Sequence, residues 1–201
     1  AAQVVARGGP DSRMLCVHAD WAIRDPARFR ETLARAAEVA AVRGALATVG
    51  IVPSRPDPGF GYIQPGETLP DGARRVARFV EKPDRARAAQ MVADGFLWNS
   101  GIFAWRAQDL LDEVREVTPE LAGALARIAD GASAFFAAVT TSVSIDVGVL
   151  ERSQRVVVLP GDFGWDDVGT WSALHRVRAH DADGNASHGR VVTRDANGNV
   201  V

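Results

Sequence analysis

The sequence predicts a layered α/β fold, and two observations lead to this prediction. Short apolar runs alternate with segments that have the apolar spacing of helices, and the alternation continues to about residue 180. Residues 14–52 also have strand–helix–strand order with short connections, which is typical of parallel strands joined by a crossover helix. With 201 residues and 47% hydrophobic content, the chain is long enough to bury one sizeable core.

The elements of the first fifty residues are marked by their boundary residues. Gly8 and Gly9 are typical of the end of a helix. Asp25 is a good N-cap and Pro26 suits a first helical position, so a helix should begin there and end at Gly44. Its expected buried stripe is Phe29, Leu33, Ala36, Ala37 and Ala40. The expected order is the end of a helix at 1–6, a strand at 14–19, this helix, and a strand at 46–52.

The rest of the chain continues the alternation and then changes character. The Pro- and Gly-rich residues 53–62 should form a rigid loop that serves as a binding wall. From residue 181 the chain is rich in turn residues, so we expect one domain over 1–180 and the start of a β module over 181–201. The intervening elements should be strands at 76–82, 96–105 and 156–159, and helices beginning at Asp84, Thr118 and Thr170.

Composition excludes several classes of function. The net charge of −2 gives no broad electrostatic attraction to polyanions, so we expect no nucleic acid and no anionic membrane as partner. No apolar stretch is long enough to span a bilayer. Cys16 is the only cysteine, which fits a reducing, cytoplasmic location. Lys82 is the only lysine among 23 basic residues; a coding bias towards arginine or a site that needs a compact ammonium would both explain this.

Polar residues set among large apolar ones mark the candidate site. Glu81 and Lys82 follow a predicted strand that Pro83 ends, and ligands of open α/β sheets bind at such strand ends. A solvated surface ion pair is the alternative reading. The stretches of this kind are Phe79-Val80-Glu81-Lys82-Pro83, Leu97-Trp98-Asn99-Ser100-Gly101-Ile102-Phe103, Ser144-Ile145-Asp146 and Gly164-Trp165-Asp166-Asp167-Val168-Gly169-Thr170-Trp171.

These four stretches, in this order, together with residues 17–20 and 50–63, resemble the mannose-1-phosphate guanylyltransferases over residues 14–175. The resemblance implies a Rossmann-like nucleotidyltransferase sandwich with a mixed, mainly parallel sheet, and a β-helix-like tail that begins near residue 181. It also implies that GTP and mannose 1-phosphate are converted to GDP-mannose and pyrophosphate, with Mg²⁺ as cofactor. The chemistry would be an in-line displacement that needs no protein nucleophile.

The resemblance assigns roles residue by residue. It implies that Asp20 and Asp167 are carboxylate ligands of one Mg²⁺, although each could instead cap a helix or turn, and Asp166 stays an outer or structural residue. Lys82 would contact the sugar phosphate. The remaining implied contacts to mannose are Glu81 and Asn99, through hydrogen bonds to hydroxyls, and Gly61, through its backbone; Asp146 is left open between the site and a structural role.

The sequence also departs from the family pattern. The glycine-rich phosphate loop that the family has near its N-terminus has no counterpart here, so we expect a chain that lacks its opening strand and is doubtful as a catalyst by itself. His18, Trp21 and the pair 147–148 are unusual at their positions. A related enzyme for another nucleotide or sugar, and a non-catalytic homologue that binds nucleotide sugars, are the alternatives. The oligomeric state stays open, a homo-oligomer included.

Overall fold

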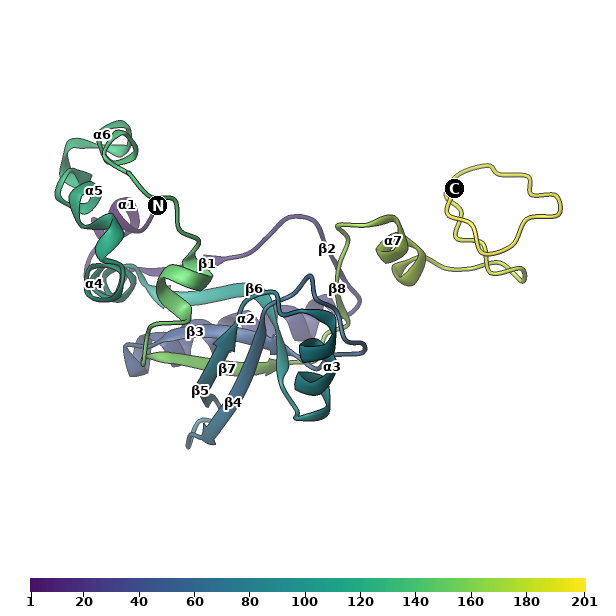
Figure 1. Ribbon diagram of the computed structural model, residues 1–201, viewed down its shortest axis with the longest axis horizontal. Helices are drawn as coiled ribbons and strands as arrows, with labels where there is room; N and C mark the ends of the chain where they lie inside the picture. Colours follow the sequence, from purple (N-terminus) through teal and green to yellow (C-terminus); the bar gives the residue numbers. More distant parts are fainter. The chain divides into compact units, whose positions relative to one another are not determined.

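The computed structural model describes residues 1–201, which form two compact units (Figure 1). The first unit comprises residues 1–17 and 30–161, and the second comprises residues 18–29 and 162–201. None of the helices is both long and apolar enough to cross a membrane.

The first unit is built on a six-stranded sheet with the strand order β1-β6-β3-β7-β5-β4. An additional pairing joins β4 to β6 where β4 begins. The strands are β1 (Arg13–Cys16), β3 (Leu46–Ile51), β4 (Tyr62–Thr68), β5 (Arg74–Val80), β6 (Leu97–Arg106) and β7 (Val156–Gly161).

The sheet is mixed, as predicted, but the expectation that it is mainly parallel is wrong. Only β3 and β7 pair in parallel, and the other pairings are antiparallel. The expected parallel neighbours β1 and β3 do run in the same direction, because both pair antiparallel with β6. β6 lies between them, so the two strands do not bond to each other. The sheet differs from the prediction because β6, which comes later in the chain, is inserted between β1 and β3.

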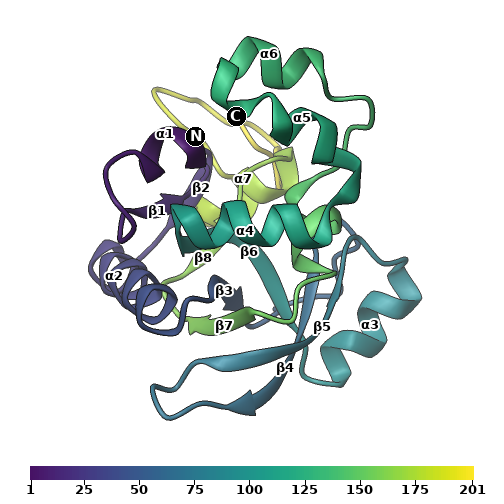
Figure 2. The same cartoon turned by 90° about the vertical axis from the view of Figure 1, so that its left-hand side faces the viewer.

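Helices of the first unit complete its core. α1 (Ala2–Ala6) lies alongside α4 (Ala107–Val117), as Figure 2 shows. Residues 30–43 of α2 (Pro26–Arg43) also belong to this unit, and Ala36 and Ala40 of its predicted stripe are fully buried. The core between sheet and helices is apolar and includes Leu46, Ile63, Phe103 and Trp105. The remaining helical segments are α3 (Arg85–Ala93), η1 (Pro119–Leu121), α5 (Ala122–Ala126), η2 (Ile128–Asp130), α6 (Ala132–Ala137) and the π-helical turn η3 (Asp146–Leu150).

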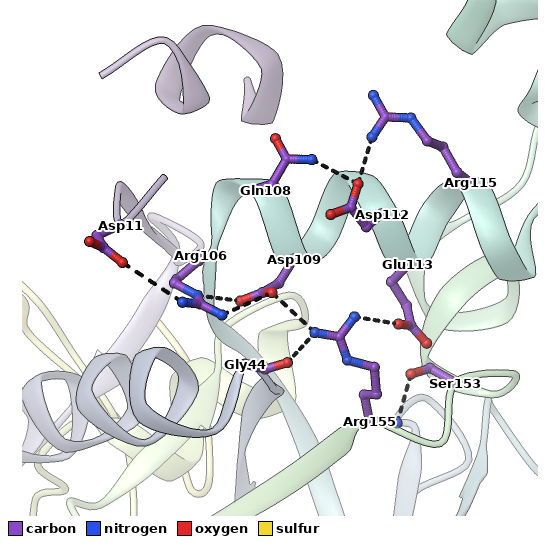
Figure 3. Close-up of polar contacts among 10 residues, drawn as sticks. All are labelled: Asp11, Gly44, Arg106, Gln108, Asp109, Asp112, Glu113, Arg115, Ser153 and Arg155. Atoms are coloured by element: carbon purple, nitrogen blue, oxygen red, sulfur yellow. Dashed lines mark hydrogen bonds and ion pairs between the residues drawn. The ribbon is translucent and has the colours of Figure 1, made fainter. Parts of the chain in front are cut away.

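A network of ion pairs holds α4 against the ends of two other elements (Figure 3). The Arg155 guanidinium, just before β7, donates to Glu113 Oε2 at 3.1 Å and to Asp109 Oδ1 at 3.1 Å. It also donates to the Gly44 carbonyl at the end of α2. Arg106 donates to the other oxygen of Asp109 at 2.6 Å. Because Glu113 and Asp109 are only 2% and 8% exposed, these carboxylates depend on the two guanidinium groups for their charge balance.

Arg155→Met is expected to lower the free energy of unfolding by about 2 kcal/mol, because it leaves a buried carboxylate without its cation. The value lies below the usual range for a broken buried pair since the Arg155 side chain is 39% exposed. Chemical denaturation measures the effect. Arg115→Met removes an exposed partner of Asp112 on the same helix and serves as the control, with an expected loss below about 0.5 kcal/mol. Equal losses for both variants would contradict the role of the network.

The second unit contains a two-stranded antiparallel sheet of β2 (Trp21–Ile23) and β8 (Trp165–Asp167), followed by α7 (Trp171–Val177). Two predicted caps are confirmed: Asp25 Oδ1 accepts from the amides of residues 27 and 28 at the start of α2, and Thr170 Oγ1 accepts from Ala173 N at the start of α7. The β-helix-like tail is not confirmed. Residues 181–201 contain one isolated bridge, between Ala186 and Val200, and the strand expected near 191–193 is absent. The domain division at residue 181 stays a prediction.

Candidate active site

Strand register brings three of the predicted site residues to one end of the sheet in the first unit. Gly61 comes just before β4, Glu81 just after β5, and Asn99 lies within β6. The first residue of β4 pairs with the last residue of β5 on one side and with β6 on the other. The backbone N–H of Asn99 donates to the Gly61 carbonyl at 2.8 Å. Residues that are far apart in the sequence therefore meet because of the pairing alone.

Gly61 lies so close to its neighbours that a side chain would collide with them. A Cβ at this position would come within 2.7 Å of Glu81 Oε2 and 3.3 Å of the Asn99 Cβ. Atoms do not approach a Cβ to within 3.0 Å without a shift. Gly61, Glu81 and Asn99 therefore lie directly against one another. The approach of the Gly61 backbone to mannose stays a prediction.

Lys82 is held beside Glu81 by an unusual backbone conformation. Its φ of +44° lies in the left-handed region, which costs an ordinary residue about 1 to 2 kcal/mol. Consecutive side chains of an extended strand point to opposite faces, but this turn lets Lys82 Nζ reach Glu81 Oε1 at 2.8 Å. The hydrogen bond from Lys82 to Glu81 is the main cause that raises the pKa of the lysine. An ammonium that stays charged, with its side chain 64% exposed, is suited to bind a phosphate.

The Asn99 amide group is fixed in orientation by its surroundings. Its Oδ1 accepts from the Gly101 amide at 3.3 Å and lies 3.1 Å from the hydroxyl of the buried Thr48. Its Nδ2 donates to Asp146 Oδ1 at 3.1 Å. Because a backbone N–H can only donate and a carboxylate accepts, oxygen and nitrogen cannot exchange places. Asn99 therefore presents a defined N–H, and Thr48 is a contributor that the sequence analysis missed.

Asp146 also lies in this cluster, through its hydrogen bond with Asn99. It lies at the start of η3, and burial is the main cause that raises the pKa of its carboxyl group, followed by the charge of Glu81. The sequence analysis also missed Glu151, whose Oε1 accepts from the Glu81 amide at 3.1 Å. The only sequence signal for Glu151 is its place a few residues after the stretch Ser144-Ile145-Asp146.

The loop before Gly61 is braced by side-chain contacts, and its role as a binding wall stays a prediction. The Tyr62 hydroxyl accepts from the Asp57 amide at 3.0 Å and donates to the Asp57 carbonyl at 3.1 Å. The Arg55 guanidinium lies 4.9 Å from the centre of the Trp98 ring and pairs with Asp57. These contacts stiffen residues 53–61 without any regular secondary structure.

The second unit contains the two carboxylates predicted to bind a metal. Asp20 comes directly before β2, and the first residue of β2, Trp21, pairs with Asp167 on β8. The neighbouring Asp166 receives two hydrogen bonds from Arg176, at 2.9 and 2.8 Å, which is a structural role. A Cβ at Gly169 would lie 3.2 Å from Asp167 Oδ2. Pairing of β2 with β8 thus places the two predicted carboxylates on adjoining chain segments.

The donor chemistry of this pair suits a hard divalent cation, with most positions left for other ligands. The protein has no cluster of three or more His, Cys, Asp or Glu side chains that could enclose a metal. Asp20 and Asp167 could therefore supply only two carboxylate ligands, and phosphate oxygens and water would complete the octahedron that Mg²⁺ prefers. Lys82 belongs to the first unit and the two carboxylates belong to the second.

Comparison with known proteins shows the family of the chain. A profile of the family described as nucleotidyl transferase matches residues 1–184. The chain is 42% identical to the xanthan biosynthesis protein XanB of Xanthomonas campestris, over 97% of this chain and 43% of that protein. It is 38% identical to the mannose-1-phosphate guanylyltransferase ManC of Salmonella typhimurium, over 95% of this chain and 42% of that protein.

Solved structures lead to the same conclusion about the fold. The crystal structure described as mannose-1-phosphate geranyltransferase from Thermus thermophilus has a TM-score of 0.82 and 35% identity, over 94% of this chain and 55% of that one. The chain thus spans less than half the length of the curated relatives that it matches. With the profile match over nearly the whole sequence, the chain belongs to the nucleotidyl transferase family.

Proposed function

We propose that this chain is part of a mannose-1-phosphate guanylyltransferase, which transfers GMP from GTP to mannose 1-phosphate and releases pyrophosphate. The observation that supports this most is the convergence of Gly61, Glu81, Lys82 and Asn99 in the first unit. It combines one cation for a phosphate with a carboxylate and an amide for sugar hydroxyls. The relative named ManC carries the same activity in its name.

The proposed reaction is an in-line displacement. A phosphate oxygen of mannose 1-phosphate attacks the α-phosphorus of GTP, and pyrophosphate leaves from the opposite side. Lys82 would bind the sugar phosphate and offset its charge. Glu81 would accept a hydrogen bond from a mannose hydroxyl and Asn99 would donate one. The protein's contribution is then positioning and electrostatic stabilisation, and no side chain acts as a nucleophile.

We propose Mg²⁺ as the cofactor and the second unit as its binding place. Asp20 and Asp167 would hold the ion. The pairing of Trp21, the residue after Asp20, with Asp167 supports this, because it brings the two carboxylates onto neighbouring segments. When bound, Mg²⁺ supplies positive charge that neutralises phosphate oxygens. A cytoplasmic location, consistent with the single Cys16, stays a prediction of the sequence.

The test uses the full-length gene product that contains this chain. It is given Mg²⁺, GTP and mannose 1-phosphate, and pyrophosphate release and nucleotide-sugar formation are followed together. Equal amounts of pyrophosphate and GDP-mannose are the expected result, with GTP preferred over ATP, UTP and dTTP, and mannose 1-phosphate preferred over glucose 1-phosphate. Preference for another pair would assign a related nucleotidyltransferase. Binding of GDP-mannose without turnover would assign a non-catalytic homologue.

A further inference from the structure

We propose that Asp146 and Glu151, the two carboxylates at the ends of η3, are positioning residues for the sugar-phosphate site. Asp146 would fix the amide of Asn99, and Glu151 would fix the backbone at Glu81 from which Lys82 projects. This inference rests on the proposed function, because it names residues that act on the same site through others.

The side-chain amide of Asn99 is oriented by a hydrogen bond to Asp146. Asn99 Nδ2 uses one N–H to reach Asp146 Oδ1 at 3.1 Å. The nitrogen of a primary amide carries a second N–H, which points away from the first within the same plane. Asp146 therefore sets the direction in which Asn99 can donate to a sugar hydroxyl. Without this acceptor, the Asn99 amide would be oriented only from its oxygen side, by Gly101 and Thr48.

The turn that carries Glu81 and Lys82 is restrained by Glu151. β5 ends at Val80, so the Glu81 amide lies beyond the strand, and its acceptor is the Glu151 carboxylate at 3.1 Å. The next residue, Lys82, has the left-handed φ of +44°. Such a conformation persists only where its surroundings hold it. The charge-assisted bond from Glu81 to Glu151 restrains the residue directly before the strained one.

η3 is itself firmly anchored by hydrogen bonds to neighbouring segments. The buried Thr118 hydroxyl donates to the Gly148 carbonyl at 2.7 Å, in the middle of the turn. Arg152, directly after Glu151, makes two hydrogen bonds to the Glu120 carboxylate and one to the Val117 carbonyl. Arg152 lowers the pKa of Glu120 to about 2, so this pair stays ionised at neutral pH. Because η3 is anchored in this way, the carboxylates of Asp146 and Glu151 are held in fixed positions.

The effect of Asp146 on stability differs from what a stabilising carboxylate would show. Burial raises the pKa of Asp146, so its ionised form is held at a cost to the fold. The sign follows from linkage: an acid whose pKa is higher in the folded state makes a contribution that is lost as the pH rises through that pKa. Asp146→Asn should therefore not lower the unfolding temperature at neutral pH. If the carboxylate stabilised the fold, the same substitution would lower that temperature.

The test compares matched pairs of variants in the full-length gene product. Asp146→Ala and Glu151→Ala remove an acceptor, while Asp146→Asn and Glu151→Gln keep an acceptor oxygen. Glu116→Ala removes an exposed carboxylate from α4 and is the control. We expect each alanine variant to raise KM for mannose 1-phosphate about tenfold with little change in kcat or in KM for GTP. The amide variants should stay within about threefold of the wild type.

The outcomes separate this inference from the proposed function. Three results would overturn the positioning role while the function stands, provided that the wild type makes GDP-mannose. The alanine variants could keep the wild-type KM for mannose 1-phosphate, or they could lose kcat and affinity for GTP to the same extent. The amide variants could also be as impaired as the alanine variants. If the wild type does not turn over mannose 1-phosphate, the proposed function fails. The stabilisation that mannose 1-phosphate gives against thermal unfolding then decides the inference: loss in the alanine variants supports it, and no stabilisation of the wild type overturns it.

Discussion

Asp167→Asn is expected to lower GTP-dependent release of pyrophosphate by about a thousandfold, because the charge stabilisation that a bound cation provides is worth several kcal/mol. Replacing the carboxylate by an amide keeps the shape of the side chain and removes the negative charge that holds a divalent ion. The fold should be intact, since Asp167 lies at the end of a three-residue strand and its neighbour Asp166 keeps the pair with Arg176. Initial rates over a range of Mg²⁺ concentrations measure the effect.

The Mg²⁺ dependence separates loss of the metal from loss of structure. If Asp167 is a ligand, half-maximal activity should need far more Mg²⁺ in the variant than in the wild type. Asp183→Asn makes the same chemical change at an exposed position of the second unit and should leave the rate unaltered. Turnover near the wild-type rate with Asp167→Asn would remove this residue from the metal site.

Lys82→Ala is expected to raise KM for mannose 1-phosphate about a hundredfold, because a hydrogen bond between charged groups contributes about 1.5 to 3 kcal/mol. The substitution also removes the cation that pairs with the Glu81 carboxylate at 2.8 Å, so that carboxylate would lie uncompensated beside the proposed phosphate position. Repulsion then adds to the lost attraction. KM for GTP should change much less, and steady-state kinetics with each substrate varied in turn measures both constants.

Two further substitutions sharpen the assignment of Lys82. Arg85→Ala removes an exposed cation at the start of α3 and should have little effect, which controls for the overall charge of the protein. Lys82→Arg keeps the charge but replaces a compact ammonium by a planar fork, so it should recover only part of the affinity. An unchanged dependence on mannose 1-phosphate in Lys82→Ala would place Lys82 outside the site.

Two elements escaped prediction because their boundaries are poorly marked, although Leu110, Leu111 and Val114 of α4 have the apolar spacing of a helix. α4 begins at Ala107 after Arg106, whose side chain makes no capping hydrogen bond, so the boundary pattern of a helix start is missing. β4 contains Pro65 and Gly66, which break a strand pattern, yet an edge strand with register shifts tolerates both. The helices opened by Asp25, Asp84 and Thr170 were predicted correctly because each has a polar cap that the chain uses.

The sequence by itself determined the family, the helix caps and the charged residues that are candidates for the site. Motifs and caps are short stretches of the chain, so they can be recognised without knowing which residues meet in space. Only the tertiary structure decided which of them meet. Strand register brought Gly61, Glu81 and Asn99 together, and the packing of η3 added Asp146 and Glu151. The insertion of β6 between β1 and β3 made the sheet largely antiparallel. Pairing partners lie dozens of residues apart and are selected by hydrogen bonding and burial over the whole sheet, which no local pattern encodes.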